Sequence, residues 1–307
     1  MNRPYNTLSS YLREKFGARV FKVTIDGGFT CPNRDGTKGY GGCVYCAPGA
    51  LTPRGFTPGL EVTEQLERGI VRVKKRHRAE KFIAYFQINT NTHAPLDYLK
   101  DMYGEVLGRA DVAGLAVSTR PDSLDEGVLS LLSEMKEQKP LWVELGLQSG
   151  NERTLEAINR KHSAADFEDA VIRAHKRGID ICAHVILGLP GEGRTEILKT
   201  IGLLSRLKVW GIKFHQLQVL RGAPLEKLYR RGGVKTLGLE EYVRLVIECL
   251  EALPPAVVVH RLFGDAPGDF LLAPRWGLNK FVLLERILER MAEMGTRQGA
   301  RMRATGG

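Results

Sequence analysis

The strongest constraint on the fold is an alternation of short apolar runs with longer segments of helical period. The apolar runs cover residues 19–25, 81–88, 113–119, 140–149, 179–190 and 211–220. Helical patterns over 61–76, 95–110, 125–138, 151–177 and 193–208 follow them. This rhythm predicts a parallel sheet with helices on its outside. The strands are nearly continuous apolar runs, as expected when both faces of a sheet are buried.

Six strand–helix units fit two α/β architectures, a partial (β/α)6 TIM-type barrel or a doubly wound sheet. In both, the functional edge lies at the carboxyl ends of the strands. The polar and glycine-rich stretches "QINTNT", "STRPD", "LQSGN" and "LGLPGE" all stand at such ends. We therefore expect the chemistry at one end of the sheet.

The domain organisation follows from the same pattern. We expect an N-terminal extension over 1–18, a barrel over 19–230, and a C-terminal appendage over 231–294 packed on the barrel. The appendage is expected to hold a helix over 239–252, a short strand over 256–263 and a helix over 278–294. The polar, basic segment 295–307 is expected to be disordered.

Composition restricts the compartment and the class of partner. The chain has 307 residues, 43% of them hydrophobic and 26% charged, and its N-terminus lacks the apolar core of a signal peptide. No run approaches the roughly 20 apolar residues of a membrane helix. We expect a cytoplasmic protein with reduced thiols and no membrane partner. The net charge of +10 suits a nucleic-acid partner, but also an ordinary arginine-rich enzyme.

A glycine-rich loop after the first strand holds Cys31, Cys43 and Cys46. A structural zinc site needs four ligands, so zinc would require a distant fourth residue such as His93. Three cysteines on a 4Fe–4S cluster would instead leave one iron open to a small molecule. Tyr45 could cover one side of the cluster or a bound adenine. Cys182 and Cys249 lie in apolar contexts and are interpreted as small buried hydrophobes.

The sequence resembles the radical S-adenosylmethionine (SAM) enzymes, specifically the YhcC-like family with its elongated cysteine motif. The resemblance runs over about 5–280, on "GGFTCPNRDGTKGYGGCVYC", "YFQINTNTHAPL", "STRPDSL", "LGLQSGNERTLEAINRKH" and "HVILGLPGE". It implies a partial barrel, a 4Fe–4S cluster on Cys31, Cys43 and Cys46, and SAM on the open iron. Reduction then cleaves SAM to methionine and a 5′-deoxyadenosyl radical, which abstracts a substrate hydrogen.

The resemblance also implies SAM contacts. Gln148 and Arg160 match a pair found in coproporphyrinogen-oxidase-like enzymes, and Arg160 would grip the methionine carboxylate. His184 stands where that branch has a ribose contact, and Leu187 and Gly188 would bring backbone near the adenine. The place of the usual Gly-Gly-Glu turn is taken by Asn89, Thr90, Asn91 and Thr92. Each side chain also has a structural alternative, as a strand-end polar residue, a surface charge or a core histidine.

The substrate is less constrained than the cofactors. The order of motifs is related to that of the Elongator catalytic subunit, a tRNA wobble-uridine modifier, including "RPD" after the third strand. With the net charge, this motivates a tRNA substrate, at the wobble-uridine side chain. The alternatives are a radical SAM enzyme acting on a small metabolite and a zinc-stabilised RNA-binding protein. An electron donor such as flavodoxin or ferredoxin is implied for the enzyme.

Three further groups of residues are candidate contacts. Residues 74–77 (Lys74, Lys75, Arg76 and His77) could bind phosphates or simply complement a helix C-terminus. Arg34 and Lys38, in the long cysteine spacing, could contact substrate or reductase. Substrate contacts at the barrel mouth are also considered, although structural roles are favoured, for Asp265, Arg275, Trp276 and Lys280.

Overall fold

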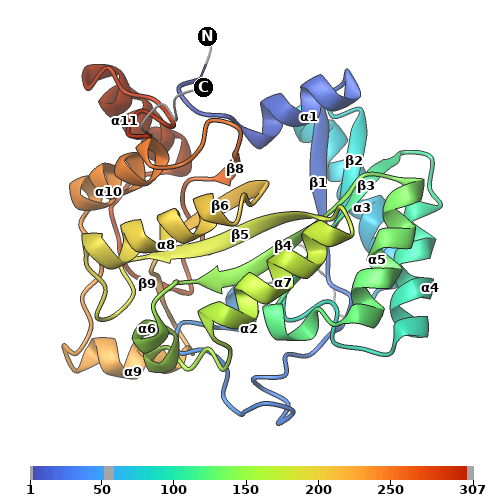
Figure 1. Ribbon diagram of the computed structural model, residues 1–307, viewed down its shortest axis with the longest axis horizontal. Helices are drawn as coiled ribbons and strands as arrows, with labels where there is room; N and C mark the ends of the chain where they lie inside the picture. The colour runs from blue at the N-terminus through green and yellow to red at the C-terminus, as the bar shows by residue number, and fades with distance from the viewer. Residues whose placement is uncertain (1–2, 52–58, 303–307) are drawn as a thin grey trace.

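Seven parallel strands form one curled sheet in the computed structural model, which describes residues 3–51 and 59–302 (Figure 1). They are β1 (Val20–Ile25), β2 (Lys81–Phe86), β3 (Val112–Thr119), β4 (Leu141–Gln148), β5 (Asp180–Leu187), β6 (Gly211–Gln216) and β8 (Val258–Arg261). Their order in the sheet follows their order in the chain. A doubly wound sheet would reverse its order at a switch point, so the predicted partial barrel is confirmed.

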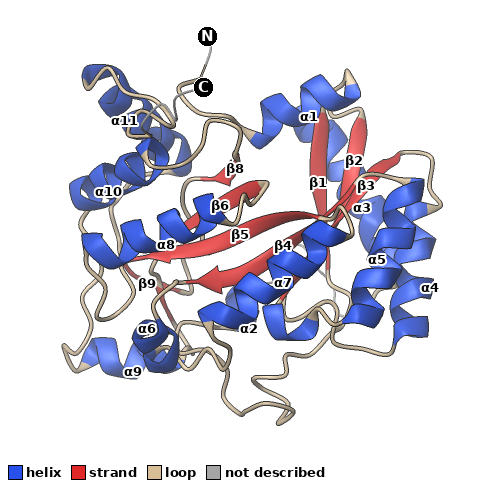
Figure 2. Ribbon diagram, viewed as in Figure 1, coloured by secondary structure: helices blue, strands red, loops and turns tan. Residues whose placement is uncertain are grey.

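Helices cover the outside of the curled sheet, as Figure 2 shows for α5, α7 and α8. Those of the barrel units are α3 (Val62–His77), α4 (Leu96–Leu107), α5 (Glu126–Gln138), α6 (Glu152–Ala157), α7 (Ala164–Lys176) and α8 (Arg194–Arg206). The others are α1 (Leu8–Phe16), α2 (Pro48–Leu51), the 3-10 turn η1 (Pro121–Ser123), α9 (Pro224–Arg230), α10 (Leu239–Glu251) and α11 (Lys280–Glu293). Within the described residues, no helix is both long and apolar enough to cross a membrane.

The strands have buried side chains on both faces, which is why their sequences are apolar throughout. All eight residues of β4 are buried, and Phe82, Phe86 and Leu115 have no exposed surface. Burying each such side chain contributes about 1.5–3 kcal/mol. Cys182 on β5 and Cys249 on α10 lie buried among apolar side chains, as predicted.

Two predicted elements differ from the structure. The run 211–220 is not one strand, because it breaks after Gln216 and continues as β7 (Val219–Leu220), which pairs antiparallel with β9 (Leu271–Ala273). The pattern over 151–177 is not one helix. It is interrupted between α6 and α7 by two residues with left-handed backbone, Asn159 and Lys161. The second helix restarts at Ser163, whose side chain caps the Asp166 amide.

The N-terminal helix closes the bottom of the barrel. Leu8 and Leu12 of α1 pack on the interior side chains Val20, Tyr85 and Trp142. The segment before α1 reaches the far edge of the sheet, where the Val259 amide donates to the Asn6 carbonyl at 2.8 Å. The extension 1–18 therefore links β1 to β8 across the open side, through the part of it that the structure describes.

The C-terminal segments are tied closely to the barrel. The strand expected in the appendage is β8, which pairs parallel with β6 as the seventh strand of the main sheet. Disorder was predicted for 295–307, but 295–302 is ordered. Gln298 is buried; its side-chain oxygen accepts from the Asn6 amide, and its nitrogen donates to the Pro254 and Val257 carbonyls. Arg301 forms an ion pair with Glu251. Residues 303–307 lie outside the described part.

Candidate active site

The cysteine loop begins just beyond β1 and is built from tight turns. The Cys31 carbonyl accepts hydrogen bonds from the amides of Arg34 (2.7 Å) and Asp35 (3.1 Å). Cys43 is buried, Cys31 and Cys46 are half-buried, and none of the three forms a disulfide. Gly42 has a left-handed backbone (φ 76°), and a Cβ there would lie 2.7 Å from Arg34 Nε. Only glycine lets the chain pass at this point.

The loop is pinned to the break between α6 and α7. The Val44 amide donates to the Ile158 carbonyl at 3.0 Å. Asn33 Nδ2 donates to the Asn159 carbonyl at 2.6 Å, and Asn159 Nδ2 donates back to the Gly42 carbonyl at 2.8 Å. The interruption that the sequence did not predict is thus what carries the residue after Asn159 to the cysteines.

Arg160 is that residue, and it lies against Cys43. Its Nη1 donates to Cys43 Sγ at 3.5 Å, and its Nη2 donates to the Gly146 carbonyl at 2.6 Å. A Cβ on Gly146 would lie 2.6 Å from Arg160 Nη2 and 2.9 Å from Gln148 Nε2. The structure therefore brings Gln148 and Arg160, both buried, together beside a cysteine. Both side chains lie so close to Gly146 that a Cβ at this position would clash with them.

The thiols sit in an environment of opposing electrostatic effects. Burial alone raises the pKa of the Cys43 thiol, but the positive charges of Arg160 and Arg120 outweigh it and leave this pKa below its usual value. Burial raises the pKa of the Cys46 thiol, and the neighbouring Cys43 and Cys31 raise it further. Burial and Cys43 likewise raise the pKa of Tyr45. Thiolates at all three positions would repel one another, and a cation bound by them would relieve that repulsion.

The segment Asn89–Thr92 joins the cysteine loop to the ends of the neighbouring strands. Asn89 Nδ2 donates to the Phe29 carbonyl at 2.8 Å, and the Thr90 amide donates to the Thr30 carbonyl. Asn91 Nδ2 donates to the Ser118 carbonyl at 2.8 Å, and Thr92 Oγ1 bonds Thr119 Oγ1. Ile88 just before it is β-branched yet has φ 78°. Such strained backbone persists where surrounding structure fixes it, often at functional sites.

Several buried polar atoms at this end of the barrel have no hydrogen-bond partner in the described structure. They are Asn33 Oδ1, Thr90 Oγ1, Asn91 Oδ1, Arg120 Nη1 and Arg160 Nε. Buried polar groups are normally paired, and each exception calls for an explanation. A polar ligand bound among them would supply the missing partners. The donor set of three thiols, a guanidinium and unpaired oxygens thus fits a cluster with a SAM molecule beside it.

The "RPD" motif braces this site, a role that sequence reasoning did not assign. Arg120 pairs with Asp122 at 2.9 Å, and its Nη2 donates to the Arg160 carbonyl at 2.9 Å. Asp122 also forms an ion pair with Lys38 of the cysteine loop, with Nζ and Oδ2 3.1 Å apart. Arg34 donates to the Cys46 carbonyl at 2.9 Å. Both charged loop residues proposed as partner contacts thus have partners within the chain.

A layer of charged side chains lies below the mouth, inside the barrel. Glu144 on β4 is fully buried and accepts from Lys22 of β1 and Lys213 of β6. These strands are not neighbours in the sheet, so the side chains meet only in the interior. We call this set the interior cluster: Glu144 with Lys22, Tyr85, His184, Lys213 and His260.

His184, the predicted ribose contact, belongs to the interior cluster. Its Nε2 lies 2.9 Å from Glu144 Oε2, and burial followed by the charge of Lys213 lowers its pKa to about 4. Leu187 and Gly188 lie at the end of β5, where the Leu187 carbonyl accepts the Leu217 amide at 2.8 Å. These three positions remain predicted SAM contacts.

The candidate substrate contacts at the C-terminal end of β6 line one pocket of about 490 Å³. Asp265, Arg275, Trp276 and Lys280 border it together with Gln216 and Gln218. Gln216 bonds both the amide and the carbonyl of Gly264, which holds the 263–280 segment at the barrel end. The turn-rich segment 263–280 thus forms one side of this pocket.

His93, the suggested fourth zinc ligand, is engaged elsewhere. Its Nε2 lies 3.0 Å from Asp35 Oδ2, and Asp35 is further held by Thr30 and Thr37. In the described residues, no group of three or more His, Cys, Asp or Glu side chains is arranged to hold a single metal ion.

Comparison with known proteins identifies the family. The family model of the Radical SAM superfamily matches residues 31–204, and that of the Radical_SAM C-terminal domain matches 209–293. Uncharacterized protein YtqA of Bacillus subtilis is 41% identical over 96% of this chain and 92% of its own length. Protein YhcC of Escherichia coli is 37% identical over 96% of this chain and 95% of its own length.

More distant similarities involve larger proteins. A tRNA uridine(34) acetyltransferase of Dehalococcoides mccartyi is 23% identical over 76% of this chain, which spans 58% of that protein. The solved structure of Elp3 from the archaeon Methanocaldococcus infernus has a TM-score of 0.68 and 20% identity, covering 91% of this chain and 64% of that one. The second likeness supports the fold alone. Taken with the geometry, the two family models and the two close relatives show that this chain is a member of the radical SAM superfamily, in the group of YtqA and YhcC, with a 4Fe–4S cluster and SAM as its cofactors.

Proposed function

We propose that this chain is a tRNA-modifying radical SAM enzyme whose cluster is held by Cys31, Cys43 and Cys46. The contact that carries the site assignment joins Arg160 Nη1 to Cys43 Sγ at 3.5 Å. It sets a predicted SAM contact beside a predicted cluster ligand. The zinc-stabilised alternative is set aside, because the cofactors of this family are a 4Fe–4S cluster and SAM.

The chain's own residues bind and orient the cofactors. When bound and reduced, the cluster and SAM supply a 5′-deoxyadenosyl radical that takes a hydrogen atom from the substrate. Arg160 orients the methionine carboxylate, since a guanidinium grips a carboxylate through two parallel hydrogen bonds. The unpaired oxygens of Thr90 and Asn91 would accept hydrogen bonds from the methionine ammonium group. Gln148 and the backbone at Leu187 and Gly188 would complete the SAM site, and His184, whose Nε2 is held by Glu144, would reach the ribose through its other ring nitrogen.

Tyr45 and the loop glycines would exclude water from one side of a bound cluster. The half-buried Cys31 and Cys46 leave another side open to an electron donor such as flavodoxin or ferredoxin. Tyr40, in the same loop, is 79% exposed and offers an aromatic contact for that donor. Aromatic side chains are enriched at protein–protein interfaces.

Two observations support tRNA as the substrate, with the wobble-uridine side chain as the reacting group. The named activity of one distant relative is on uridine 34 of tRNA. The net charge of +10 favours a polyanionic partner in the cytoplasm. The pocket bordered by Trp276 and Asp265 is large enough for a single nucleobase with its side chain.

The test compares tRNA nucleosides by mass spectrometry in a strain lacking the gene, the same strain complemented, and the strain carrying Cys43→Ala. We expect one modified nucleoside to disappear, or its precursor to accumulate, in the deletion and in Cys43→Ala, and the change to be reversed by the wild-type gene. An unchanged nucleoside profile, together with no tRNA binding at low salt, would overturn the tRNA assignment.

The cluster assignment has its own measurement. Anaerobically reconstituted wild-type protein should hold about four irons per chain and absorb broadly near 400 nm. Cys31→Ala, Cys43→Ala and Cys46→Ala should each lose most of this iron and all SAM cleavage. Cys249→Ala is the matched control, because Cys249 is buried in α10 and should leave both unchanged. Retention of iron in all three loop variants would refute the ligand assignment.

A small-metabolite substrate is the second candidate, favoured by the size of the pocket. A volume of about 490 Å³ lies within the range of small-molecule sites. This candidate predicts that 5′-deoxyadenosine formation rises with a metabolite extract freed of RNA and does not respond to tRNA. The opposite pattern would support the tRNA proposal.

A further inference from the structure

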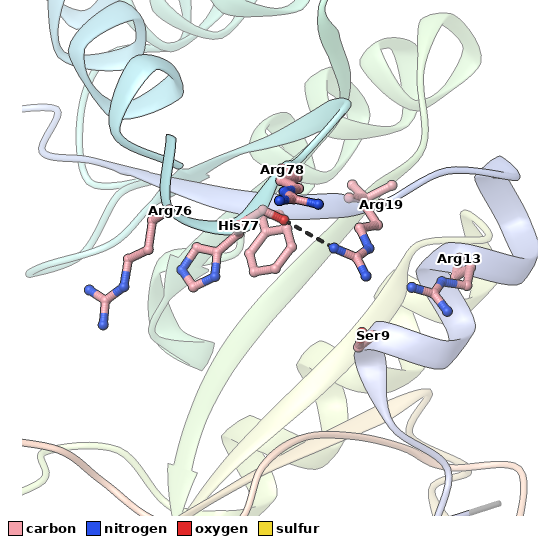
Figure 3. A pocket seen from close by; sticks show the side chains of 8 residues that line it. Ser9, Arg13, Arg19, Arg76, His77 and Arg78 are labelled. Carbon is pink, nitrogen blue, oxygen red and sulfur yellow. Dashed lines mark hydrogen bonds between the residues drawn. The ribbon is translucent and has the colours of Figure 1, made fainter. Parts of the chain in front are cut away.

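A second, strongly basic pocket lies at the other end of β1, away from the cysteine loop. Its volume is about 450 Å³, and α1, the start of β1 and the end of α3 surround it. Figure 3 shows Arg13 and Arg19 on the α1 side of His77 and Arg76 on the opposite side. We call it the arginine pocket. It is lined by Arg13, Arg19, Arg76, Arg78 and His77, with Ser9, Val20 and Phe21.

Two helix ends deliver these side chains. The last turn of α1 contains Arg13, and that of α3 contains Arg76 and His77. Arg78 follows α3 with a left-handed backbone (φ 51°), an uncommon conformation for a residue with a side chain. The His77 ring stacks on Phe21 of β1, with ring centres 4.6 Å apart and planes 13° from parallel. This stack forms the floor of the pocket between Arg76 on one side and Arg19 and Arg13 on the other (Figure 3).

Complementing the helix dipoles explains only part of this arrangement. Basic side chains near a helix C-terminus are favourable, and Arg19 Nη1 does approach the His77 carbonyl at 3.5 Å. In the described part of the chain, however, the guanidinium groups of Arg13, Arg76 and Arg78 have neither a hydrogen-bond nor an ion-pair partner. All four arginines are exposed. Glu80 accepts from the Arg19 backbone amide at 3.2 Å and forms no ion pair with a pocket arginine in the described residues.

The pocket therefore carries a concentrated positive field. Partial burial lowers the pKa of His77, and the charges of Arg76 and Lys280 lower it further, so the imidazole adds little charge of its own. The guanidinium groups of Arg13, Arg76 and Arg78 lack a counter-charge in the described structure, and a bound phosphate would supply one. Guanidinium is the side chain best matched to phosphate, through paired N–H donors.

We propose that the arginine pocket binds backbone phosphates of the RNA substrate, as a docking site separate from the barrel mouth. The inference rests on the proposed tRNA function and names where the RNA is held. The six residues of β1 separate the pocket from the cysteine loop by roughly 20 Å. A small metabolite cannot occupy both places at once, whereas a folded RNA can contact both. Such phosphate contacts position an RNA without reading its sequence.

The test measures the binding of fluorescently labelled tRNA to the cluster-loaded protein as a function of salt. The pocket variant is Arg19→Gln with Arg76→Gln. The control is Arg153→Gln with Arg206→Gln, two exposed arginines on α6 and α8 that remove the same charge. We expect the pocket variant to bind at least about tenfold more weakly, and its log–log salt slope to fall by about 1 to 2. The control should change affinity by less than about threefold.

A second readout separates docking from catalysis. SAM cleavage by the reduced protein in the absence of RNA should be unchanged in the pocket variant, because no pocket residue belongs to the SAM site. Inorganic phosphate and pyrophosphate are added as competitors. If either displaces tRNA only at concentrations that act through ionic strength, the RNA backbone is the ligand. If phosphate binds tightly at the pocket and tRNA affinity is the same with and without bound phosphate, the pocket binds a free anion and the proposal fails.

The two failures can be told apart. If wild-type protein binds tRNA and the pocket variant binds like the control, the arginine pocket is not the docking site, while the tRNA function stands. If wild-type protein binds no tRNA at low salt, the proposed function fails first and the docking site with it.

Discussion

The barrel contains two layers of polar side chains that differ in hydrogen bonding: the groups of the lower layer are mostly paired, and several of those in the upper layer are not. In the interior cluster, Glu144 accepts from six different side chains, Trp142 being the sixth, and among the buried polar atoms of the cluster His260 Nε2 alone has no partner in the described structure. One layer higher, at the mouth, five buried polar atoms have none. An unpaired buried group costs about 1–3 kcal/mol. The lower layer is built to hold the barrel together, and the upper layer to receive a ligand.

The largest expected effect breaks the interior cluster. Glu144→Gln keeps the shape but removes the negative charge, which leaves the buried Lys213 and the half-buried Lys22 without compensation. We expect the free energy of unfolding in urea to fall by about 3–5 kcal/mol. Glu137→Gln on α5, an exposed position, is the control and should change stability by less than about 0.5 kcal/mol. Equal effects of the two changes would mean that the cluster holds nothing together.

Arg160→Lys tests the mouth. The lysine keeps the positive charge but cannot make two parallel hydrogen bonds to a carboxylate. We expect the SAM dissociation constant, measured by calorimetry on the cluster-loaded protein, to rise about 10- to 100-fold, because a charge-assisted hydrogen bond contributes about 1.5–3 kcal/mol. Arg153→Lys, on the exposed face of α6, should leave SAM affinity unchanged. Unchanged affinity for Arg160→Lys would remove this residue from the SAM site.

The interior cluster should also make stability depend on pH. Burial and the charge of Lys213 lower the pKa of His184 to about 4. Burial and the charge of Lys22 lower the pKa of His260 to about 3. The value for an unfolded chain is 6.5. Between pH 6.5 and 4.5 the unfolded chain therefore binds protons that the folded chain does not, so stability falls as pH falls. Each histidine contributes a slope of about 1.4 kcal/mol per pH unit once its unfolded form is protonated.

His260→Gln should remove one such contribution without reversing the sign. Unfolding in urea at several pH values between 4.5 and 6.5 measures the slope for both proteins. Glu144 faces the same histidines, but it stays ionised over this range because its pKa lies well below 4.5. A slope identical to that of the wild type would show that His260 already titrates normally in the folded protein.

The smallest expected change is in the free energy of unfolding of two threonine variants at the mouth, which should differ in sign. Thr90 Oγ1 is buried without a partner, whereas Thr92 Oγ1 bonds Thr119 Oγ1 and the Ser123 carbonyl. Thr90→Val should leave the stability of the cofactor-free protein unchanged or raise it by up to about 1 kcal/mol, while weakening SAM binding. Thr92→Val should lower stability by about 1–3 kcal/mol. If Thr90→Val is as destabilising as Thr92→Val, its hydroxyl has a structural partner after all.

Much of the barrel follows from the sequence, because the apolar runs and the strand-end motifs are local patterns. The pairing of Gln148 with Arg160 also follows from the resemblance, since the twelve-residue spacing matches. The interior cluster does not follow, because Lys22, Glu144 and Lys213 stand on three separated strands and meet only after the sheet curls. A charged residue within an apolar strand is the signal that could have marked each of them.

The arginine pocket and the brace formed by Arg120 and Asp122 were missed for a similar reason. Residues 74–77 stood out as a basic run, but Arg13 and Arg19 join them only through the packing of α1 beside β1 and α3. The break that delivers Arg160 depends on two left-handed residues, Asn159 and Lys161, neither of which is glycine. Tertiary hydrogen bonds from the cysteine loop stabilise that break, so local pattern alone does not reveal it.

Hydrogen exchange of the cluster-loaded protein with and without SAM tests the difference between the two layers most directly. We expect SAM to slow exchange in the cysteine loop, in 88–92 and in 146–160. We expect little change in β1 and at the start of β4, where Lys22 and Glu144 are already paired. Protection centred on the interior strands, with none at 88–92 or 146–160, would contradict this expectation.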